Sequence, residues 1–234
     1  MKNALKTIIA AAAIGLAGVC AVAAEPLKVG FAAEPYPPFA SPDASGKWEG
    51  WEVEFMQAIC KQAKLDCVIT PVAWDGIIPA LTSKKIDMIV GSMSITPERL
   101  KTIDFSDKYY NTPTGVMGPK AEKFDATPAG LKGKTIGVQV STIHQDYATK
   151  YFGGAGATVK EYQTQDEANN DLAAGRIDAV QADAIALDAF LKSDQGKQCC
   201  ELKAKINAAI KAIRANGTYD AFSKKYFDFD IYGG

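Results

Sequence analysis

The strongest constraint on the fold is a regular alternation of apolar runs and helical patterns in the first half of the chain. Residues 27–31, 67–69 and 86–90 are apolar runs typical of buried strands. Between them, residues 51–63 and 76–81 carry apolar side chains at helical spacing. This β-α-β-α-β order predicts an α/β fold with a parallel sheet, and ligands bind beside the carboxyl ends of the strands in such sheets.

A second series of the same kind follows. Strands are predicted at residues 134–139, 157–160 and 177–181, and each is followed by a helical pattern or a polar turn. An extended stretch bounded by prolines separates the two series. The sequence therefore predicts two α/β lobes with a ligand-binding cleft between them.

Residues 1–24 have the features of a secretory signal peptide. Two lysines precede an apolar run at residues 8–22, and small residues follow that run. Cleavage would leave 24 basic against 27 acidic residues, a balance that does not favour nucleic acid or an anionic membrane surface as a partner. The alternative is lipidation at Cys20, which is disfavoured because the bulky Val19 precedes it. We therefore expect an exported protein.

Export permits disulfides, and four cysteines follow the signal peptide. Cys60 ends a helical pattern and Cys67 begins the next strand, so a short local disulfide between them is one possibility. Cys199 and Cys200 are adjacent, and a bridge between neighbours strains the backbone, so their pairing stays open. One histidine, His144, and no Cys-x-x-Cys pair give little support for a metal site.

Residues 91–99 carry the clearest candidate binding groups. Ser92 and Ser94 share one side of an extended chain, directly after a predicted strand. Thr96, followed by proline, is typical of a helix N-terminus, and Arg99 falls in the first turn. Hydroxyls, unpaired backbone N–H groups and a guanidinium together suit a small carboxylate. The alternative is a capped helix with a solvated arginine.

Two aromatic residues follow the other predicted strands of the first series. Tyr36 lies in a proline-bound loop after the first strand, and Trp74 follows the second. Loop aromatics often line ligand sites, although a packed surface loop would also use them. Because Ser92 follows the third strand, the three residues together indicate one crevice at the same edge of the sheet.

Several motifs of this chain occur together, in the same order, in a known family. They are YPPF (36–39), GWEVE (50–54), WDGIIPAL (74–81), KID (85–87), SMSITPER (92–99), IDFS (103–106), LKGK (131–134), AGRIDA (174–179) and GTY (217–219). Each motif alone is weak evidence, but the set spans nearly all of the chain after the signal peptide. The sequence resembles the periplasmic polar amino-acid-binding proteins of ABC importers (solute-binding family 3), of the lysine/arginine/ornithine and histidine type.

The resemblance implies a type II periplasmic-binding-protein fold with two hinged lobes. Residues 25–113 and 201–234 would form the first lobe, and residues 114–200 the second. Relatives have about two more strands near residues 198–203, which carry the second hinge and part of the first-lobe sheet. Here the chain passes almost directly into a helix predicted from Leu202, so that part of the first-lobe sheet and the second hinge are expected to be missing.

By resemblance, the carboxylate of a bound amino acid would meet Arg99. Backbone N–H groups near Ser94 and in the turn at Thr142 and Ile143 would assist it. Ile143 stands where relatives often have threonine, so this position keeps its backbone donor and loses a hydroxyl.

The resemblance assigns the other end of the amino acid to Asp183. That carboxylate would bind the α-ammonium, together with Ser92 and the carbonyl of Gly91. Gly91 stands where relatives often have serine, which removes a hydroxyl from the expected pocket.

The resemblance also places aromatic and acidic residues around the ligand side chain. Tyr36 and Trp74 would flank it, and Glu34 would face a cationic group at its end. The family further implies a disulfide between Cys60 and Cys67.

We expect a monomeric periplasmic protein that captures a cationic amino acid, or an arginine-derived opine, and delivers it to the membrane subunits of an ABC importer. Binding with hinge closure needs no covalent chemistry, so we expect no enzyme activity, cofactor or metal. The alternative is an enzyme, because some periplasmic cyclohexadienyl dehydratases resemble this fold and His144 or Glu34 could act as acid or base. A receptor's ligand-sensing domain is disfavoured, since no membrane span or signalling segment follows.

Overall fold

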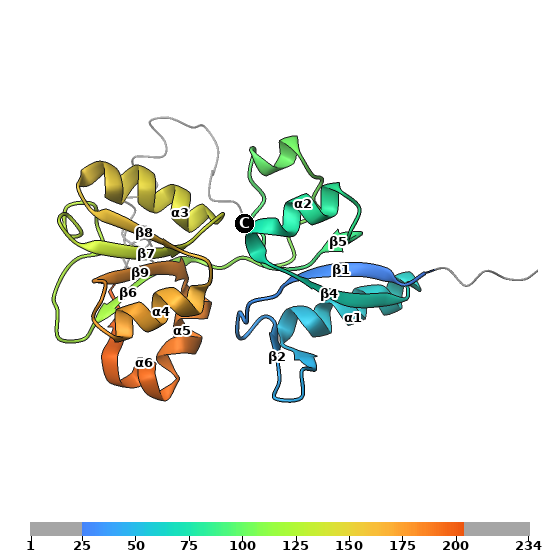
Figure 1. The fold of residues 1–234 in the computed structure, drawn as a ribbon, viewed down its shortest axis with the longest axis horizontal. Helices are drawn as coiled ribbons and strands as arrows, with labels where there is room; N and C mark the ends of the chain where they lie inside the picture. The colour runs from blue at the N-terminus through green and yellow to red at the C-terminus, as the bar shows by residue number, and fades with distance from the viewer. Residues whose placement is uncertain (1–24, 204–234) are drawn as a thin grey trace, which may run out of the picture.

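The computed structural model describes residues 25–203, which form two lobes (Figure 1). Residues 103–113 contain no helix or strand and connect the lobes. The predicted signal peptide and the predicted helices after Leu202 lie outside the described residues. No helix within the described part is long and apolar enough to cross a membrane.

The first lobe is built on a parallel sheet in the order β4–β1–β5. The central strand β1 (Leu27–Ala32) pairs with β4 (Cys67–Val72) and with the short β5 (Met88–Ile89). Val29 and Phe31 of β1 are completely buried. The predicted parallel sheet is confirmed, and it has three strands among the described residues.

Helix α1 (Trp51–Ala63) packs an apolar face, including Val53 and Met56, against the core of this sheet. A disulfide between Cys60 and Cys67 joins the end of α1 to the start of β4, as the resemblance implied. The other elements of the lobe are β2 (Ser41–Pro42), β3 (Trp48–Glu49), α2 (Ile77–Thr82) and the 3-10 turns Trp74–Gly76 and Arg99–Lys101.

The second lobe contains a mixed five-stranded sheet in the order β10–β6–β9–β7–β8. Strand β7 pairs in parallel with β8 and β9, whereas β6 pairs antiparallel with β9 and β10. The strands are β6 (Thr114–Pro119), β7 (Thr135–Gln139), β8 (Thr158–Tyr162), β9 (Ala179–Asp183) and β10 (Cys200–Leu202). The α-helices are α3 (Ile143–Tyr147), α4 (Gln165–Ala173), α5 (Ala184–Leu191) and α6 (Asp194–Cys199).

Local capping explains where two helices of this lobe begin. Thr142 Oγ1 accepts a hydrogen bond from the Gln145 N–H at 3.2 Å, and α3 continues into a π-helical turn, Ala148–Phe152. Thr164 and Glu167 form a capping box at the start of α4. These hydrogen bonds satisfy backbone N–H groups that have no partner inside the helix.

The helix expected at residues 96–99 is only one short turn, Arg99–Lys101. Thr96 Oγ1 accepts a hydrogen bond from the Arg99 N–H at 3.2 Å, which confirms its predicted capping role. The chain after this turn crosses to the second lobe without further helix or strand until Thr114.

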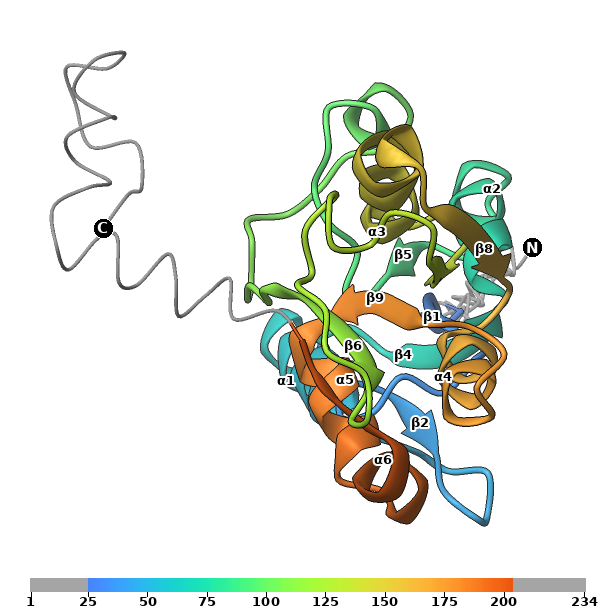
Figure 2. The ribbon, with the colours of Figure 1, turned by 90° about the vertical axis from the view of Figure 1, so that its left-hand side faces the viewer.

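The end of the described chain also differs from expectation. Leu202 ends strand β10 and does not begin a helix, so the first residues of the range 201–234 lie in the second-lobe sheet. Figure 2 shows α5 and α6 beside β6 and this edge strand. The edge strand pairs its backbone groups with β6, and Lys203 N–H donates to Val116 O at 2.8 Å. The predicted helix start at Leu202 was wrong because it followed apolar spacing alone, and that spacing does not show strand pairing. The rest of the predicted helix lies outside the described residues.

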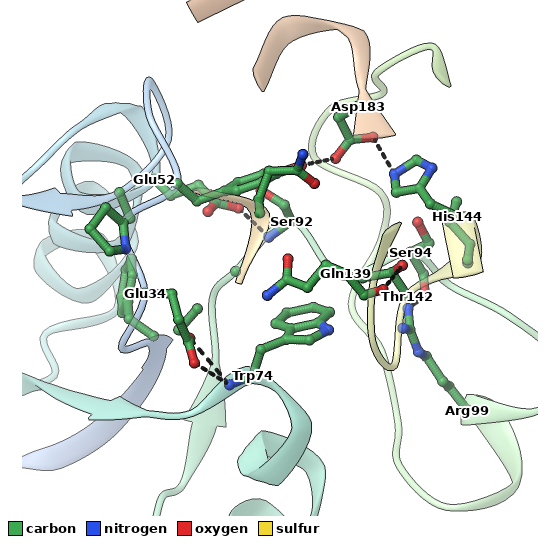
Figure 3. Close-up of a pocket in the computed structure, with 18 residues that line it drawn as sticks. Glu34, Glu52, Trp74, Ser92, Ser94, Arg99, Gln139, Thr142, His144 and Asp183 are labelled. Carbon is green, nitrogen blue, oxygen red and sulfur yellow. Dashed lines mark hydrogen bonds and ion pairs between the residues drawn. The ribbon is translucent and has the colours of Figure 1, made fainter. Parts of the chain in front are cut away.

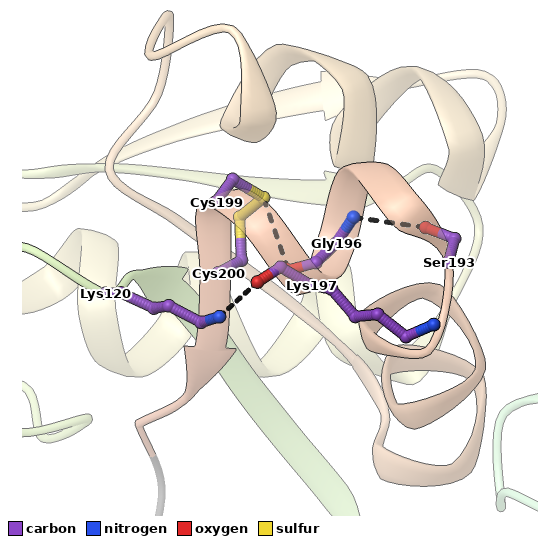
Figure 4. The surroundings of a disulfide bond; sticks show 6 residues. All are labelled: Lys120, Ser193, Gly196, Lys197, Cys199 and Cys200. Carbon is purple, nitrogen blue, oxygen red and sulfur yellow. Dashed lines mark hydrogen bonds between the residues drawn. A yellow bond between two sulfur atoms is a disulfide. The ribbon is translucent and has the colours of Figure 1, made fainter.

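Cys199 and Cys200, whose pairing the sequence left open, form a disulfide at the junction of α6 and β10 (Figure 4). Cys200 is buried, and the Lys120 ammonium donates a hydrogen bond to the carbonyl of Lys197 beside the pair.

Candidate functional site

A pocket of about 730 Å³, part of it open to solvent, lies between the two lobes (Figure 3). All ten residues predicted from the sequence line it: Glu34, Tyr36, Trp74, Gly91, Ser92, Ser94, Arg99, Thr142, Ile143 and Asp183. Their roles toward a ligand remain predictions.

Asp183 forms the centre of one end of the pocket, where β9 ends and α5 begins. Its Oδ2 accepts a hydrogen bond from Tyr36 Oη at 2.9 Å, and its Oδ1 accepts one from Thr112 Oγ1 at 2.5 Å. His144 Nε2 lies 3.4 Å from Oδ1. Burial favours a higher pKa for this carboxyl, but His144, Thr112 and Tyr36 outweigh it and hold the pKa of Asp183 below its usual value. Asp183 is therefore an anion.

Arg99 lies at the other end of the pocket. Its guanidinium donates hydrogen bonds to Ser94 O and to Ser141 O, both at 2.9 Å, and its Cζ is 5.9 Å from the centre of the Trp74 ring. The Trp74 indole N–H also donates to Ser141 O, at 3.2 Å. Burial lowers the pKa of Arg99, yet an arginine stays protonated at any physiological pH. The carbonyl of Ser141 thus joins the two lobes at this end.

The middle of the pocket contains small and acidic groups of the first lobe. The Glu34 carboxylate accepts hydrogen bonds from the Trp74 backbone N–H at 3.3 and 3.4 Å. A Cβ atom added at Gly91 would meet the Trp74 ring at 3.8 Å, an ordinary contact distance. The space around position 91 would therefore accommodate the serine that relatives often have there.

Glu52 is a buried acidic residue that the sequence analysis did not assign to the site. It is 1% exposed and accepts hydrogen bonds from Ser92 N–H at 2.6 Å and Tyr109 Oη at 2.7 Å. Tyr110 Oη in turn donates to Ser92 Oγ. Burial raises the pKa of Glu52, against the opposing effect of these hydrogen bonds. This network fixes Ser92, whose φ of 55° lies in the left-handed region, against the interlobe linker.

The other pocket residues that the sequence analysis did not assign to ligand binding are Phe31, Ala32, Pro35, Ala40, Gln139, Gln165 and His144, which it named only as an acid or base of the alternative enzyme. Two signals could have found some of them. Glu52 belongs to the GWEVE motif, and His144 is the single histidine of the chain, in the first turn of a predicted helix. No group of three or more His, Cys, Asp or Glu side chains arranged to hold a metal occurs in the described part of the chain.

The two-lobed fold and its interlobe pocket agree with the comparison to known proteins. The family of bacterial extracellular solute-binding proteins, family 3, matches residues 27–229. The chain belongs to this family. The predicted family and the type II periplasmic-binding fold are thereby confirmed.

Individual members of the family give closer parallels. The L-arginine-binding protein of Pseudomonas aeruginosa is 40% identical over 235 residues, covering 89% of this chain and 90% of the relative. The alignment has 235 positions but covers only 89% of this 234-residue chain. The relative therefore contains residues that this chain lacks. A solved ancestral arginine-binding protein bound to arginine superimposes with a TM-score of 0.70 at 31% identity, covering 86% of this chain and 97% of that chain.

A third neighbour bears on enzyme activity. It is an ancestral amino acid-binding protein described as a precursor of cyclohexadienyl dehydratase, with a TM-score of 0.68 and 27% identity over 86% of this chain and 95% of that chain. Even this neighbour is itself an amino acid-binding protein, and the curated relative above is a binding protein.

Proposed function

We propose that this protein binds one cationic α-amino acid in the pocket between its lobes and delivers it, as a monomer in the periplasm, to an ABC importer. The observation that supports this most strongly is that a partly buried guanidinium, that of Arg99, and a partly buried carboxylate, that of Asp183, line the same pocket. A zwitterion buried between lobes needs both of its charges matched, because an unpaired buried charge is costly.

The α-carboxylate of the ligand binds Arg99, with the backbone N–H groups of Ser94 and of the turn at Thr142 and Ile143. The planar guanidinium can still offer N–H groups beyond the two that donate to carbonyls. The α-ammonium binds the Asp183 carboxylate, together with Ser92 and the Gly91 carbonyl. The hydroxyls that already donate to Asp183 orient its oxygens.

The side chain of the ligand lies between Tyr36 and Trp74, and its charge is positive. Three carboxylates line the pocket, from Glu34, Glu52 and Asp183, against the single guanidinium of Arg99. After the zwitterion is paired, the remaining negative charge favours a cationic group. Aromatic faces add cation–π attraction, and Glu34 offers a carboxylate. The similarity to arginine-binding proteins supports the same ligand class.

Binding works by closure of the lobes. Among residues 25–203, three hydrogen bonds span the two lobes: Tyr36 to Asp183, Trp74 to Ser141, and Arg99 to Ser141. A ligand that contacts both lobes stabilises the closed state relative to the open one. The protein itself needs no cofactor for this role.

The test is isothermal titration calorimetry of the purified protein at pH 8 with arginine, lysine, ornithine, histidine, glutamine and glutamate. The proposal expects saturable one-to-one binding, tightest for a cationic amino acid and absent for glutamate. Tight binding of glutamate, or no binding of any amino acid, would contradict it. Incubation with prephenate under the same conditions tests the enzyme alternative, and we expect no product.

A further inference from the structure

His144 is a buried pocket residue that the proposed binding scheme does not use. Its side chain is almost completely enclosed, lines the pocket from the first turn of α3 and approaches Asp183 (Figure 3). Nε2 lies 3.4 Å from Asp183 Oδ1, while Nδ1 has no hydrogen-bond partner among the described residues. It is also the only histidine in the 234-residue sequence.

His144 differs from the other neighbours of Asp183 in the charge it can carry. Tyr36 and Thr112 donate to Asp183 through neutral hydroxyl groups. Imidazole is the side chain whose charge ordinarily changes between pH 5 and 8. A protonated His144 would neutralise the carboxylate that is to receive the α-ammonium of the ligand.

We propose that His144 is a proton-linked member of the ammonium subsite, whose imidazolium competes with the α-ammonium of the ligand for Asp183. Ligand binding then releases a proton from His144, and affinity falls as the pH drops below neutrality. This inference rests on the proposed function, because it needs an amino acid with a free α-ammonium in this pocket.

The unpartnered Nδ1 atom adds a second, independent reason. Imidazolium carries an N–H group on both ring nitrogens. In this closed arrangement the Nδ1–H group would be buried without an acceptor, and a buried unsatisfied donor is costly. Closure of the lobes around a ligand therefore favours neutral His144, with Nε2–H donating to Asp183.

Other ionisable groups on the elements around the pocket must be distinguished from His144. They are Asp146 on α3 itself, Glu34 and Tyr36 in the loop after β1, Glu52 on α1, Arg99 in its 3-10 turn and Tyr110 in the linker. Arg99 stays charged, and burial raises the pKa of both tyrosines, so none of these three changes charge between pH 5 and 8. Burial also raises the pKa of Glu52, which makes this carboxyl the main competing explanation.

The experiment measures the affinity for the tightest-binding amino acid of the calorimetric panel at half-unit steps from pH 5 to 8. It compares the wild type with His144→Gln, whose amide keeps an N–H donor for Asp183, and with Glu52→Gln. We expect wild-type affinity to fall by up to tenfold per pH unit on the acid side. The dependence should be nearly flat in His144→Gln and unchanged in Glu52→Gln.

Nuclear magnetic resonance on the wild type gives an independent readout, because the chain has a single imidazole. Adding ligand at pH 6 should move the ring resonances of His144 toward those of neutral imidazole, to an extent that matches the pH dependence of affinity. Ring resonances that the ligand does not move, or a pH dependence of affinity that survives in His144→Gln, would overturn the inference. Absence of any binding at pH 8 contradicts the proposed function instead, so the two failures are distinguishable.

Discussion

At the scale of single residues, the site is organised by two opposite charges held by neutral donors and carbonyls. Arg99 donates to two backbone carbonyls, and Asp183 accepts from two hydroxyls. Among the described residues, Arg99 forms no salt bridge, and Asp183 pairs with a single basic side chain, that of His144. Both charges are thus held in place and available to a zwitterion.

Replacing Arg99 with alanine is expected to weaken amino-acid binding by about 30-fold or more. Losing one partner of a buried, hydrogen-bonded charge pair costs about 2 kcal/mol or more in binding free energy. Calorimetry against the preferred amino acid measures the effect. Arg176→Ala is the matched control, because Arg176 is exposed, pairs with Asp171 and lies outside the pocket. An Arg99→Ala variant that binds like the control would exclude the carboxylate assignment.

The pH dependence of stability tests the burial of Glu52. Its pKa is raised by burial, so the folded state binds the proton more tightly than the unfolded state. The contribution of Glu52 to stability is therefore present at low pH and is lost as the pH rises through the folded-state pKa. Because glutamine cannot ionise, the free energy of unfolding of Glu52→Gln relative to wild type should be higher at pH 7 than at pH 4.

Urea unfolding at the two pH values measures this difference. The control is Glu54→Gln, since Glu54 lies on the exposed face of the same helix. If the difference in unfolding free energy between Glu52→Gln and wild type is the same at both pH values, the fold does not raise the pKa of Glu52.

The sequence predicted the site residues whose type and position in a motif both indicate ligand binding. It did not predict residues that are placed in the site only by tertiary contacts. Ser92 and Arg99 follow a strand end in a motif, so the sequence showed them as candidates. Glu52 sits in the first turn of a helix, where an acid already has a local reason to occur. Its burial depends on Tyr109 and Tyr110 of the linker, far along the chain.

At the scale of elements, the pocket exists because several strand ends meet at one place. Tyr36 follows β1, Trp74 follows β4 and Ser92 follows β5, while Asp183 ends β9 in the other lobe. The order of strands and helices predicted this convergence. The single turn at residues 99–101 was not predictable, because local capping signals do not reveal that the chain must soon cross between lobes.

The two disulfides are expected to differ in their effect on stability. In the loop-entropy account, a bridge stabilises more when it closes a longer loop. Cys60 and Cys67 are seven residues apart, whereas Cys199 and Cys200 are neighbours. We expect the double variant Cys60→Ser/Cys67→Ser to lose about 2 kcal/mol of unfolding free energy, and the corresponding variant of the adjacent pair to lose less.

Urea unfolding of both double variants and the wild type, under oxidising conditions, measures this contrast. The order of the two losses is the prediction. A larger loss from the adjacent pair would mean that Cys199 and Cys200 stabilise the junction of α6 and β10 by more than chain entropy.

At the scale of the whole molecule, the order of the motifs along the chain predicted the family and the two lobes. The detail after α5 could not be predicted, because β10 is defined by its pairing with β6 about 80 residues earlier in the chain. The expected shortening agrees with the extra residues of the aligned relative. The pocket between the lobes nonetheless contains all ten predicted residues.

The most direct test of the central claim, that both charges of an amino acid are bound between the lobes, is the thermal unfolding midpoint with matched ligands. Arginine, lysine and histidine are compared with agmatine, which is arginine without its carboxylate. A ligand at 100 times its Kd stabilises the folded state by about 2.7 kcal/mol, a midpoint shift of about 5 °C or more for a chain of this size. We predict such a shift for at least one of the three amino acids and none for agmatine. Equal shifts with arginine and agmatine, or no shift with any ligand, would contradict the account.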